Sequence, residues 1–142
     1  MSVRGVVLLV GLGSVFAACG GPGKREATAL ADAVDRYRRA DDASKDTEGK
    51  AVAAVACTDA RVCDAKQACL AAIEPTTRAL ALKSEVVRML AEIEEKRLAP
   101  DAPEAAALPG KLDEAERLLK DGRAGMARCD ARLTDLRVAF GA

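Results

Sequence analysis

The stretch "LDEAERLLKDGRAGMARCDARLTDLRVAF", residues 112–140, has the most regular pattern of apolar residues in the chain. Small or apolar side chains recur in it at steps of three and four residues, which is the spacing of a heptad seam. They are Leu112, Ala115, Leu119, Gly122, Met126, Cys129, Leu133, Leu136 and Phe140. The pattern predicts a helix with one buried edge, weakened at Gly122 and Gly125, where a break would be tolerated. We expect this seam to pack inside the chain, against the preceding helix, rather than to bind a partner as a zipper.

A first helix is predicted earlier in the chain, over residues 24–56. Its apolar face follows steps of three and four residues and comprises Ala27, Leu30, Val34 and Tyr37. The face fades at Asp41 and Asp42 and returns at Ala51. The pattern therefore predicts one long helix that bends near Gly49.

A second helix is predicted over residues 60–98, with Thr58 or Asp59 as its N-cap. Pro75 lies inside it, so we expect a kink or a brief break there, because proline removes a helical hydrogen bond. Beyond the proline the apolar face is wide and comprises Leu80, Leu82, Val86, Val87, Leu90 and Ile93. A wide face is typical of a helix that packs against two neighbours rather than one.

A proline-rich connector, "APDAPEAAALPG", spans residues 99–110. Its prolines and Gly110 fit poorly inside a helix. The chain is 50% apolar and 31% charged, is rich in good helix formers, and has no alternating strand pattern. The sequence therefore predicts an all-α fold, an elongated antiparallel bundle of three helices.

The N-terminus reads as an export signal. It has one basic residue, Arg4, followed by an apolar run over residues 5–18 that is too short to span a bilayer as a stable helix. The run ends in Ala17 and Ala18, directly before Cys19. This end resembles the lipobox of bacterial lipoproteins, over about the first 20 residues only. An ordinary secretory signal is the alternative.

The resemblance implies that residues 1–18 are removed and that Cys19 becomes the lipidated N-terminus of the mature chain. Lipoproteins of this class carry two or three acyl chains, such as palmitate, and more than one chain gives a stable anchor. Residues 19–23 would then be the lipidated cysteine with a flexible tether, and residues 24–142 the bundle domain. Gly20, rather than aspartate, follows the cysteine, which in this family favours the outer membrane of the cell envelope.

Four further cysteines, Cys57, Cys63, Cys69 and Cys129, are expected to form two disulfides in an exported chain. Pairing Cys63 with Cys69 would join two different faces of one helix, so that connectivity is disfavoured. We favour Cys57–Cys63 with Cys69–Cys129, and Cys57–Cys69 with Cys63–Cys129 remains open. Neither the paired spacing of a zinc site nor the C-x-x-C of a redox pair is present, so we expect no bound metal.

Composition argues against several classes of function. The formal charge is +0 and aromatic residues make up 2% of the chain, which disfavours nucleic-acid binding. The chain has no histidine, the commonest general base, and Ser44 and Ser84 lack a nucleophile setting. We therefore expect no catalytic residues and no cofactor.

Two charged clusters are weaker candidates for binding. Acidic residues gather at Asp41, Asp42, Asp46 and Glu48, without the spacing of an EF-hand, and read as a solvated turn. Basic residues gather at Arg36, Arg38 and Arg39. They could contact lipid phosphates, although a solvated face with ion pairs is the simpler interpretation.

These observations predict a membrane-anchored envelope lipoprotein whose disulfide-stapled bundle is a structural or protein-interaction module. The expected partners are the membrane, through the lipid, and an envelope protein. The alternative is an accessory or inhibitor subunit of an envelope enzyme or transport complex.

Overall fold

The computed structural model describes residues 21–141, and this part of the chain is folded into five helices with no strand. The helices are α1 Pro22–Arg39, α2 Lys45–Ala54, α3 Ala60–Glu94, α4 Pro103–Ala106 and α5 Leu108–Phe140. The predicted all-α, elongated antiparallel bundle is confirmed.

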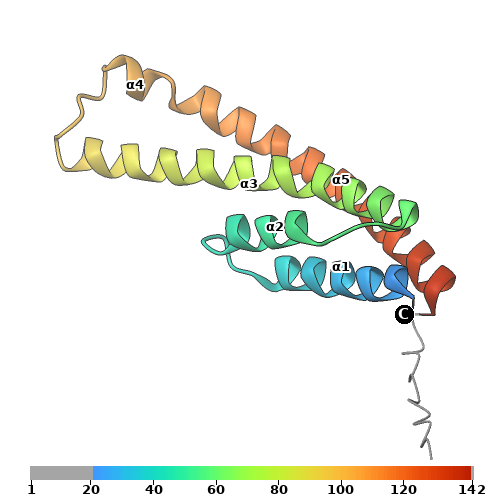
Figure 1. Cartoon of the computed structure of the whole chain (residues 1–142). Helices are drawn as coiled ribbons and strands as arrows, with labels where there is room; N and C mark the ends of the chain where they lie inside the picture. The colour runs from blue at the N-terminus through green and yellow to red at the C-terminus, as the bar shows by residue number, and fades with distance from the viewer. Residues whose placement is uncertain (1–20, 142) are drawn as a thin grey trace, which may run out of the picture.

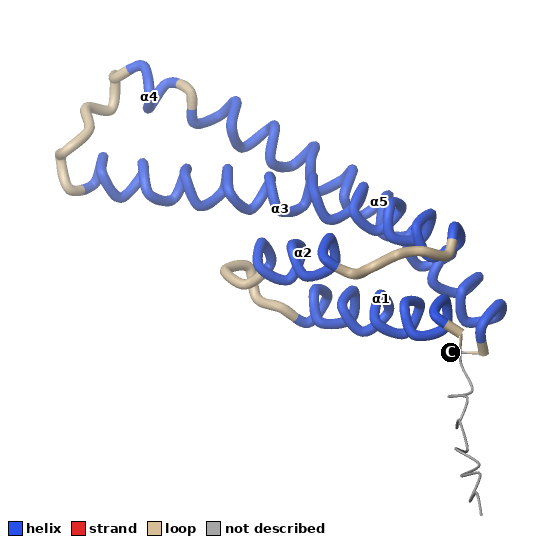
Figure 2. Tube along the Cα trace, viewed as in Figure 1, coloured by secondary structure: helices blue, strands red, loops and turns tan. Residues whose placement is uncertain are grey.

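Two long helices form the frame of the molecule. The helices α3 and α5 run antiparallel as a hairpin that turns through α4, and α1 and α2 form a shorter antiparallel pair beside it (Figure 1). We call the end that holds the start of α1 and the end of α5 the proximal end, and the turn through α4 the distal end. Figure 2 shows the loops gathered at the distal turn and beside α2.

The predicted first helix is two helices, and the predicted bend near Gly49 is wrong. The chain breaks at residues 40–44, where Ala40 leaves helical geometry with a ψ of 144°. Asp41 then accepts a 2.8 Å hydrogen bond from the backbone N–H of Ser44, which begins the next helix. Gly49 lies inside α2, and a Cβ there would come within 2.9 Å of Ile73 Cγ2. It allows α2 to approach α3.

The helix α3 is continuous through Pro75, where a kink or a brief break was predicted, and it ends at Glu94 rather than near residue 98. Asp59 accepts the hydrogen bond of its first turn, from the Arg61 N–H, as expected of an N-cap. The connector accordingly covers residues 95–107 and includes α4. Proline is tolerated at the starts of α4 and α5, because the first N–H groups of a helix have no intrahelical acceptor.

The helix α5 is also continuous, and its two central glycines mark a close approach instead of a break. A Cβ on Gly125 would come within 2.9 Å of Ala72 Cα, and one on Gly122 within 3.1 Å of the Ala72 carbonyl oxygen. The predicted seam shifts at the distal end of α5, where Leu118 is buried and Leu112 is 44% exposed. The glycines allow α5 to lie directly against α3.

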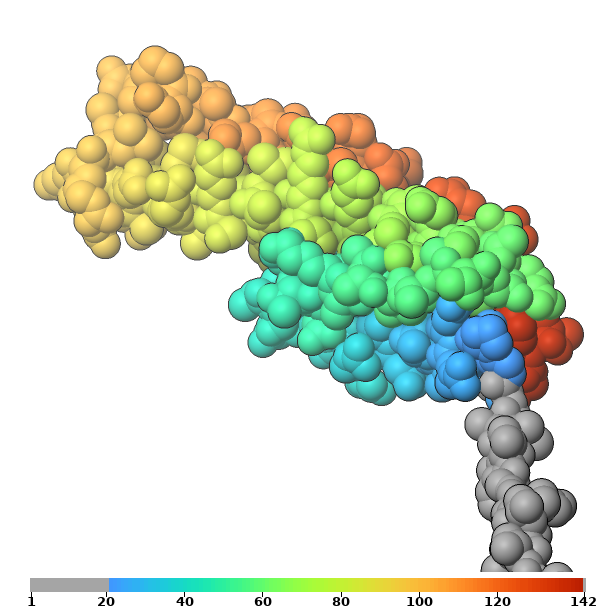
Figure 3. Space-filling view, viewed as in Figure 1, coloured from blue at the N-terminus to red at the C-terminus, as the bar shows by residue number. Residues whose placement is uncertain are grey.

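The core lies mainly at the proximal end. Its largest cluster draws on α1, α2, α3 and α5 and includes the predicted face of the first helix, Ala27, Leu30, Val34 and Tyr37. Two small clusters of α3 and α5 residues continue it toward the distal turn. Figure 3 shows α1 and α2 covering the proximal half of α3, beyond which the hairpin stands clear of them.

Candidate functional site

Two disulfides staple the bundle, in the pairing that the sequence analysis favoured. Cys57 pairs with Cys63, with the Cα atoms 5.1 Å apart, at the corner where the chain enters α3. Cys69 pairs with Cys129, with the Cα atoms 4.5 Å apart. The second bond joins α3 to α5, next to the glycine contact with Ala72, and both of its cysteines are fully buried.

The entry to α3 is held by α1 as well as by the disulfide. Glu26 accepts hydrogen bonds from the Thr58 N–H at 2.8 Å and from the Thr58 hydroxyl at 2.7 Å. These bonds favour the charged carboxylate and lower the pKa of Glu26. The Arg61 side chain likewise lowers the pKa of Asp59 and lies 4.3 Å from the centre of the Phe140 ring. The first and last helices are thus both tied to the entry of α3 at the proximal end.

Cys19, the predicted lipidation site, lies outside the described residues. The structure shows where the chain that follows it goes. α1 begins at Pro22, and Gly23 is buried, where a Cβ would come within 2.9 Å of the Phe140 ring. The flexible tether predicted over residues 19–23 is therefore wrong for its last two residues, and only Gly20 and Gly21 separate Cys19 from α1.

The acidic cluster is used internally. Asp41 caps the turn before α2, and the pKa of its carboxyl is lowered mainly by its hydrogen bonds with Ser44. Asp46 pairs with Lys50 at 2.6 Å, and Glu48 lies 3.5 Å from Arg36. Within residues 21–141 no three histidine, cysteine or acidic side chains gather closely enough to hold a metal ion.

The basic cluster of α1 also contributes to packing. Arg36 pairs with Glu48 of α2, and Arg38 pairs with Asp35 and with Asp130 of α5. These two cations therefore tie α1 to its neighbours, as the solvated-face interpretation expected.

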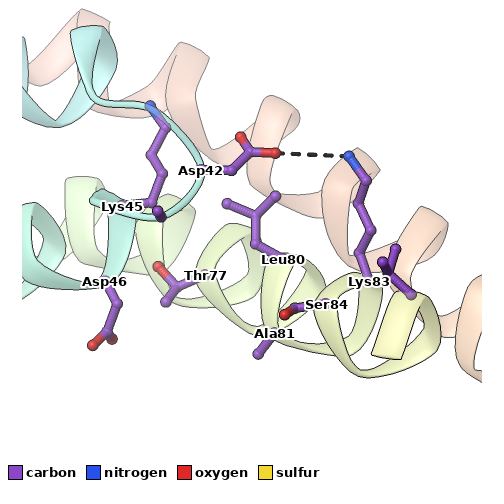
Figure 4. A pocket seen from close by; sticks show the side chains of 10 residues that line it. Asp42, Lys45, Asp46, Thr77, Leu80, Ala81, Lys83 and Ser84 are labelled. Atoms are coloured by element: carbon purple, nitrogen blue, oxygen red, sulfur yellow. Dashed lines mark ion pairs between the residues drawn. The ribbon is translucent and has the colours of Figure 1, made fainter. Parts of the chain in front are cut away.

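A groove opens on α3 at the edge of the α1–α2 layer. It encloses about 540 Å³, and Leu80, Ala81 and Val87 form much of its floor. Asp42, from the loop between α1 and α2, pairs with Lys83 of α3 at 3.7 Å across its mouth (Figure 4). Lys45 is turned to the end of α1, where its ammonium donates to the carbonyls of Tyr37 and Arg38.

The groove lies on a stripe of α3 that we call the α3 stripe, with successive steps of four and three residues. Its members are Ile73, Thr77, Leu80, Ser84, Val87 and Ala91. Ile73 is buried under α2, whereas Ser84 is exposed and Val87 is 59% exposed. The sequence analysis expected two neighbours for this part of α3 and missed that α1 and α2 end before its second half. Ser84, considered above as a nucleophile, lies on this exposed part, and Ser44 is the N-cap residue before α2.

Among the described residues, no helix combines the length and the apolar character needed to cross a bilayer. The comparisons with known proteins add no relative: no family model, curated protein or solved structure matches the chain.

Proposed function

We propose that this protein is a bacterial lipoprotein, anchored through Cys19, whose helical bundle is a non-catalytic structural or protein-interaction module at the cell envelope. The observation that carries the proposal is the apolar run ending in Ala17-Ala18-Cys19. A folded domain begins only three residues later, at Pro22. We place the anchor in the outer membrane, following Gly20.

The short tether supports a defined geometry for the anchored protein. Gly20 and Gly21 span at most about 7 Å, since an extended chain covers about 3.5 Å per residue. The lipid would therefore hold the proximal end beside the membrane surface. α3 has 35 residues and is about 50 Å long at 1.5 Å per residue, so the distal turn can reach far from the anchor.

The two disulfides support export. Disulfides persist in oxidising compartments such as the bacterial periplasm and are rare in the cytosol. They are suited to this chain, because an alanine-rich core buries little apolar area for each residue.

The exposed half of the α3 stripe supports an interaction role. A large apolar side chain such as Val87, 59% exposed beside an apolar groove, is a feature of binding surfaces. The same observation favours the second candidate, an accessory or inhibitor subunit that lays this helix face on an envelope enzyme or transport complex.

The first test is the intact mass of the mature protein extracted from the membrane fraction, measured with and without reductant. We expect a diacyl or triacyl addition on Cys19. Reduction should add four hydrogens, two for each disulfide.

A Cys19→Ala chain is the matched control, and it should lose both the added mass and the membrane association. An unmodified Cys19 in the membrane fraction would contradict the anchor. Partner capture on the anchored protein, compared between the native chain and a Val87→Lys chain, would then test the interaction role.

A further inference from the structure

The α3 stripe changes its surroundings half-way along the helix. Its first residues pack under α2, where Gly49 allows the backbone to come close to Ile73, and Thr77 Oγ1 is buried. The α1–α2 layer then ends at the loop of residues 40–44, from which Asp42 pairs with Lys83 of α3. The stripe therefore continues beyond an existing helix interface without a helix to cover it.

The distal half of the stripe, where Ser84 and Val87 are exposed and Leu80 and Ala91 are half-buried, has the side-chain pattern of a helix-packing surface. Leu80, Ser84, Val87 and Ala91 follow steps of four, three and four residues, as do the a and d positions of a coiled coil. The opposite face of the same helix is already occupied, because Val86 and Met89 are buried in the cluster that α3 shares with the start of α5. α3 thus has two packing faces over this stretch, and α5 occupies one of them.

We propose that the missing neighbour is the α3 stripe of a second copy of this chain, packed antiparallel about a twofold axis. A twofold interface uses the same patch on both partners, so the patch must be complementary to itself. The pairing goes beyond the proposed anchoring role and does not require it, and it competes with the accessory-subunit candidate for the same face of α3.

The stripe meets that condition in one antiparallel register. Centring the twofold axis between Glu85 and Val86 places Ser84 of one copy opposite Val87 of the other, and Leu80 opposite Ala91. Each layer then pairs one larger side chain with one small side chain, which allows two helices to approach without voids. The same layers recur on both sides of the axis.

The flanking charges are compatible with this register. Lys83 lies alongside Leu90 of the second copy, whose side chain is 47% exposed in the single chain, and the lysine stem can cover it. Arg88 lies alongside Ala81 of the second copy and keeps its ion pair with Glu92 on its own helix.

The outline of the molecule also fits. The α1–α2 layer forms a step on α3, with the groove of about 540 Å³ at its foot, and the bare half of α3 projects beyond the step. In the dimer, the exposed half of α3 in the second copy packs on the exposed half of α3 in the first copy. The distal end of each copy then lies at the groove of the other. If both anchors insert in one membrane, the twofold axis is perpendicular to the bilayer. The long helices then lie parallel to the membrane surface.

Cross-linking with a short bis-maleimide tests the pairing on the full chain in its membrane fraction. Ser84→Cys adds a thiol next to the axis, on an exposed side chain that the fold does not need. We expect a covalent product of twice the monomer mass on a reducing gel. Val138→Cys is the matched control, because Val138 is 84% exposed on α5, away from the stripe, and should give monomer only.

A third variant tests the seam itself. Val87→Lys in the Ser84→Cys chain should abolish the covalent dimer, because the register would bury an unpaired ammonium between the helices. Monomer from Ser84→Cys, equal yields from Ser84→Cys and Val138→Cys, or a product with a different protein would each overturn the proposal.

The unsubstituted chain separates this proposal from the lipid anchor. If it cross-links, Cys19 carries a free thiol and the anchor proposal fails, and the three variants are then compared in a Cys19→Ala chain. If it does not cross-link, the variants report on the pairing directly.

Discussion

At the proximal end α3 and α5 are covered by α1 and α2, whereas at the distal end they have only each other. Thirteen buried residues among those described form the proximal cluster, against three in each of the two distal clusters. Both disulfides also lie on the proximal side, at Cys57–Cys63 and Cys69–Cys129. The same pair of helices is therefore strongly supported over half of its length and weakly supported over the rest.

This difference indicates that the two ends have different roles. Stability resides where four helices meet, and the open face for binding lies where two helices are left alone. Regions with few buried apolar contacts open at a lower free energy than the core. The predictions that follow test how far the two ends differ, beginning with the largest effect.

Removing the buried disulfide should cost the most. Cys69 and Cys129 close a loop of 60 residues, and the chain-entropy model assigns such a link about 4 kcal/mol. The Cys57–Cys63 link closes 6 residues and is worth about 2 kcal/mol in the same model. Urea unfolding of the two double-alanine variants measures both losses. A larger loss for the Cys57–Cys63 variant would contradict the assignment of the buried link as the main staple.

Truncating one leucine at each end compares the two cores directly. Leu30 is 0% exposed in the proximal cluster, and Leu30→Ala should destabilise the fold by about 4 kcal/mol, near the top of the range for buried leucines. Leu118 is 7% exposed in the thin distal core, and Leu118→Ala should cost about 2 kcal/mol. Unfolding free energies from urea titration decide between them, and equal losses would mean that the distal hairpin is packed as firmly as the proximal end.

The glycines of α5 offer a sharper version of the comparison. Gly125→Ala places a methyl group 2.9 Å from Ala72 and should destabilise the fold by about 1–3 kcal/mol, because the two backbones must separate. Gly110→Ala, in the first turn of the same helix, meets nothing within 4 Å and should stabilise it by up to about 1 kcal/mol. Thermal unfolding of both variants should show shifts of opposite sign. Two upward shifts would show that α3 and α5 can separate at no cost.

The smallest expected effect is that of pH. Hydrogen bonds from Thr58 lower the pKa of Glu26 at the proximal end, and Lys111, 2.6 Å away, lowers that of Glu85 at the distal end. A carboxyl whose pKa is lower in the folded chain stabilises it fully above its unfolded pKa, and this contribution is lost as the pH falls through the folded pKa.

Urea midpoints measured from about pH 7 to about pH 3 should therefore decline at the acid end. Glu26→Gln and Glu85→Gln should each make the decline shallower, by small amounts because water reaches both carboxyls. A midpoint that rises on acidification would contradict these pKa directions.

Much of the fold was predictable because the buried face of a helix follows from the spacing of apolar residues nearby in the sequence. The buried face of α1, the seam of α5 from Ala115 to Leu136, and the cap at Asp59 all appear in the sequence as steps of three and four or as a short polar side chain. The break before α2 was missed, although the Asp41–Ser44 pair that makes it is local and could have signalled it.

The remaining errors concern the role of the glycines and which faces of α3 are covered by other helices. Both depend on residues that are distant in the sequence. Gly49, Gly122 and Gly125 were interpreted as weak points of helices, whereas each allows a neighbouring helix to approach. Half of the α3 stripe is exposed because α1 and α2 are shorter than α3. The sequence of α3 itself does not indicate how far α1 and α2 extend along it. The groove was therefore absent from the prediction.

The buried staple also determines how this protein responds to tension. Cys69 and Cys129 lie 60 residues apart in the chain and 4.5 Å apart between their Cα atoms. A force that pulls Gly21 away from Gly141 reaches this bond and bypasses the whole distal hairpin. About 200 Å of contour length, at about 3.5 Å per residue, stays locked behind it even after the helices around it have come apart. The part of α3 that forms the floor of the groove is therefore mechanically shielded, whereas Asp42 and Lys45 at the other side of the groove are not.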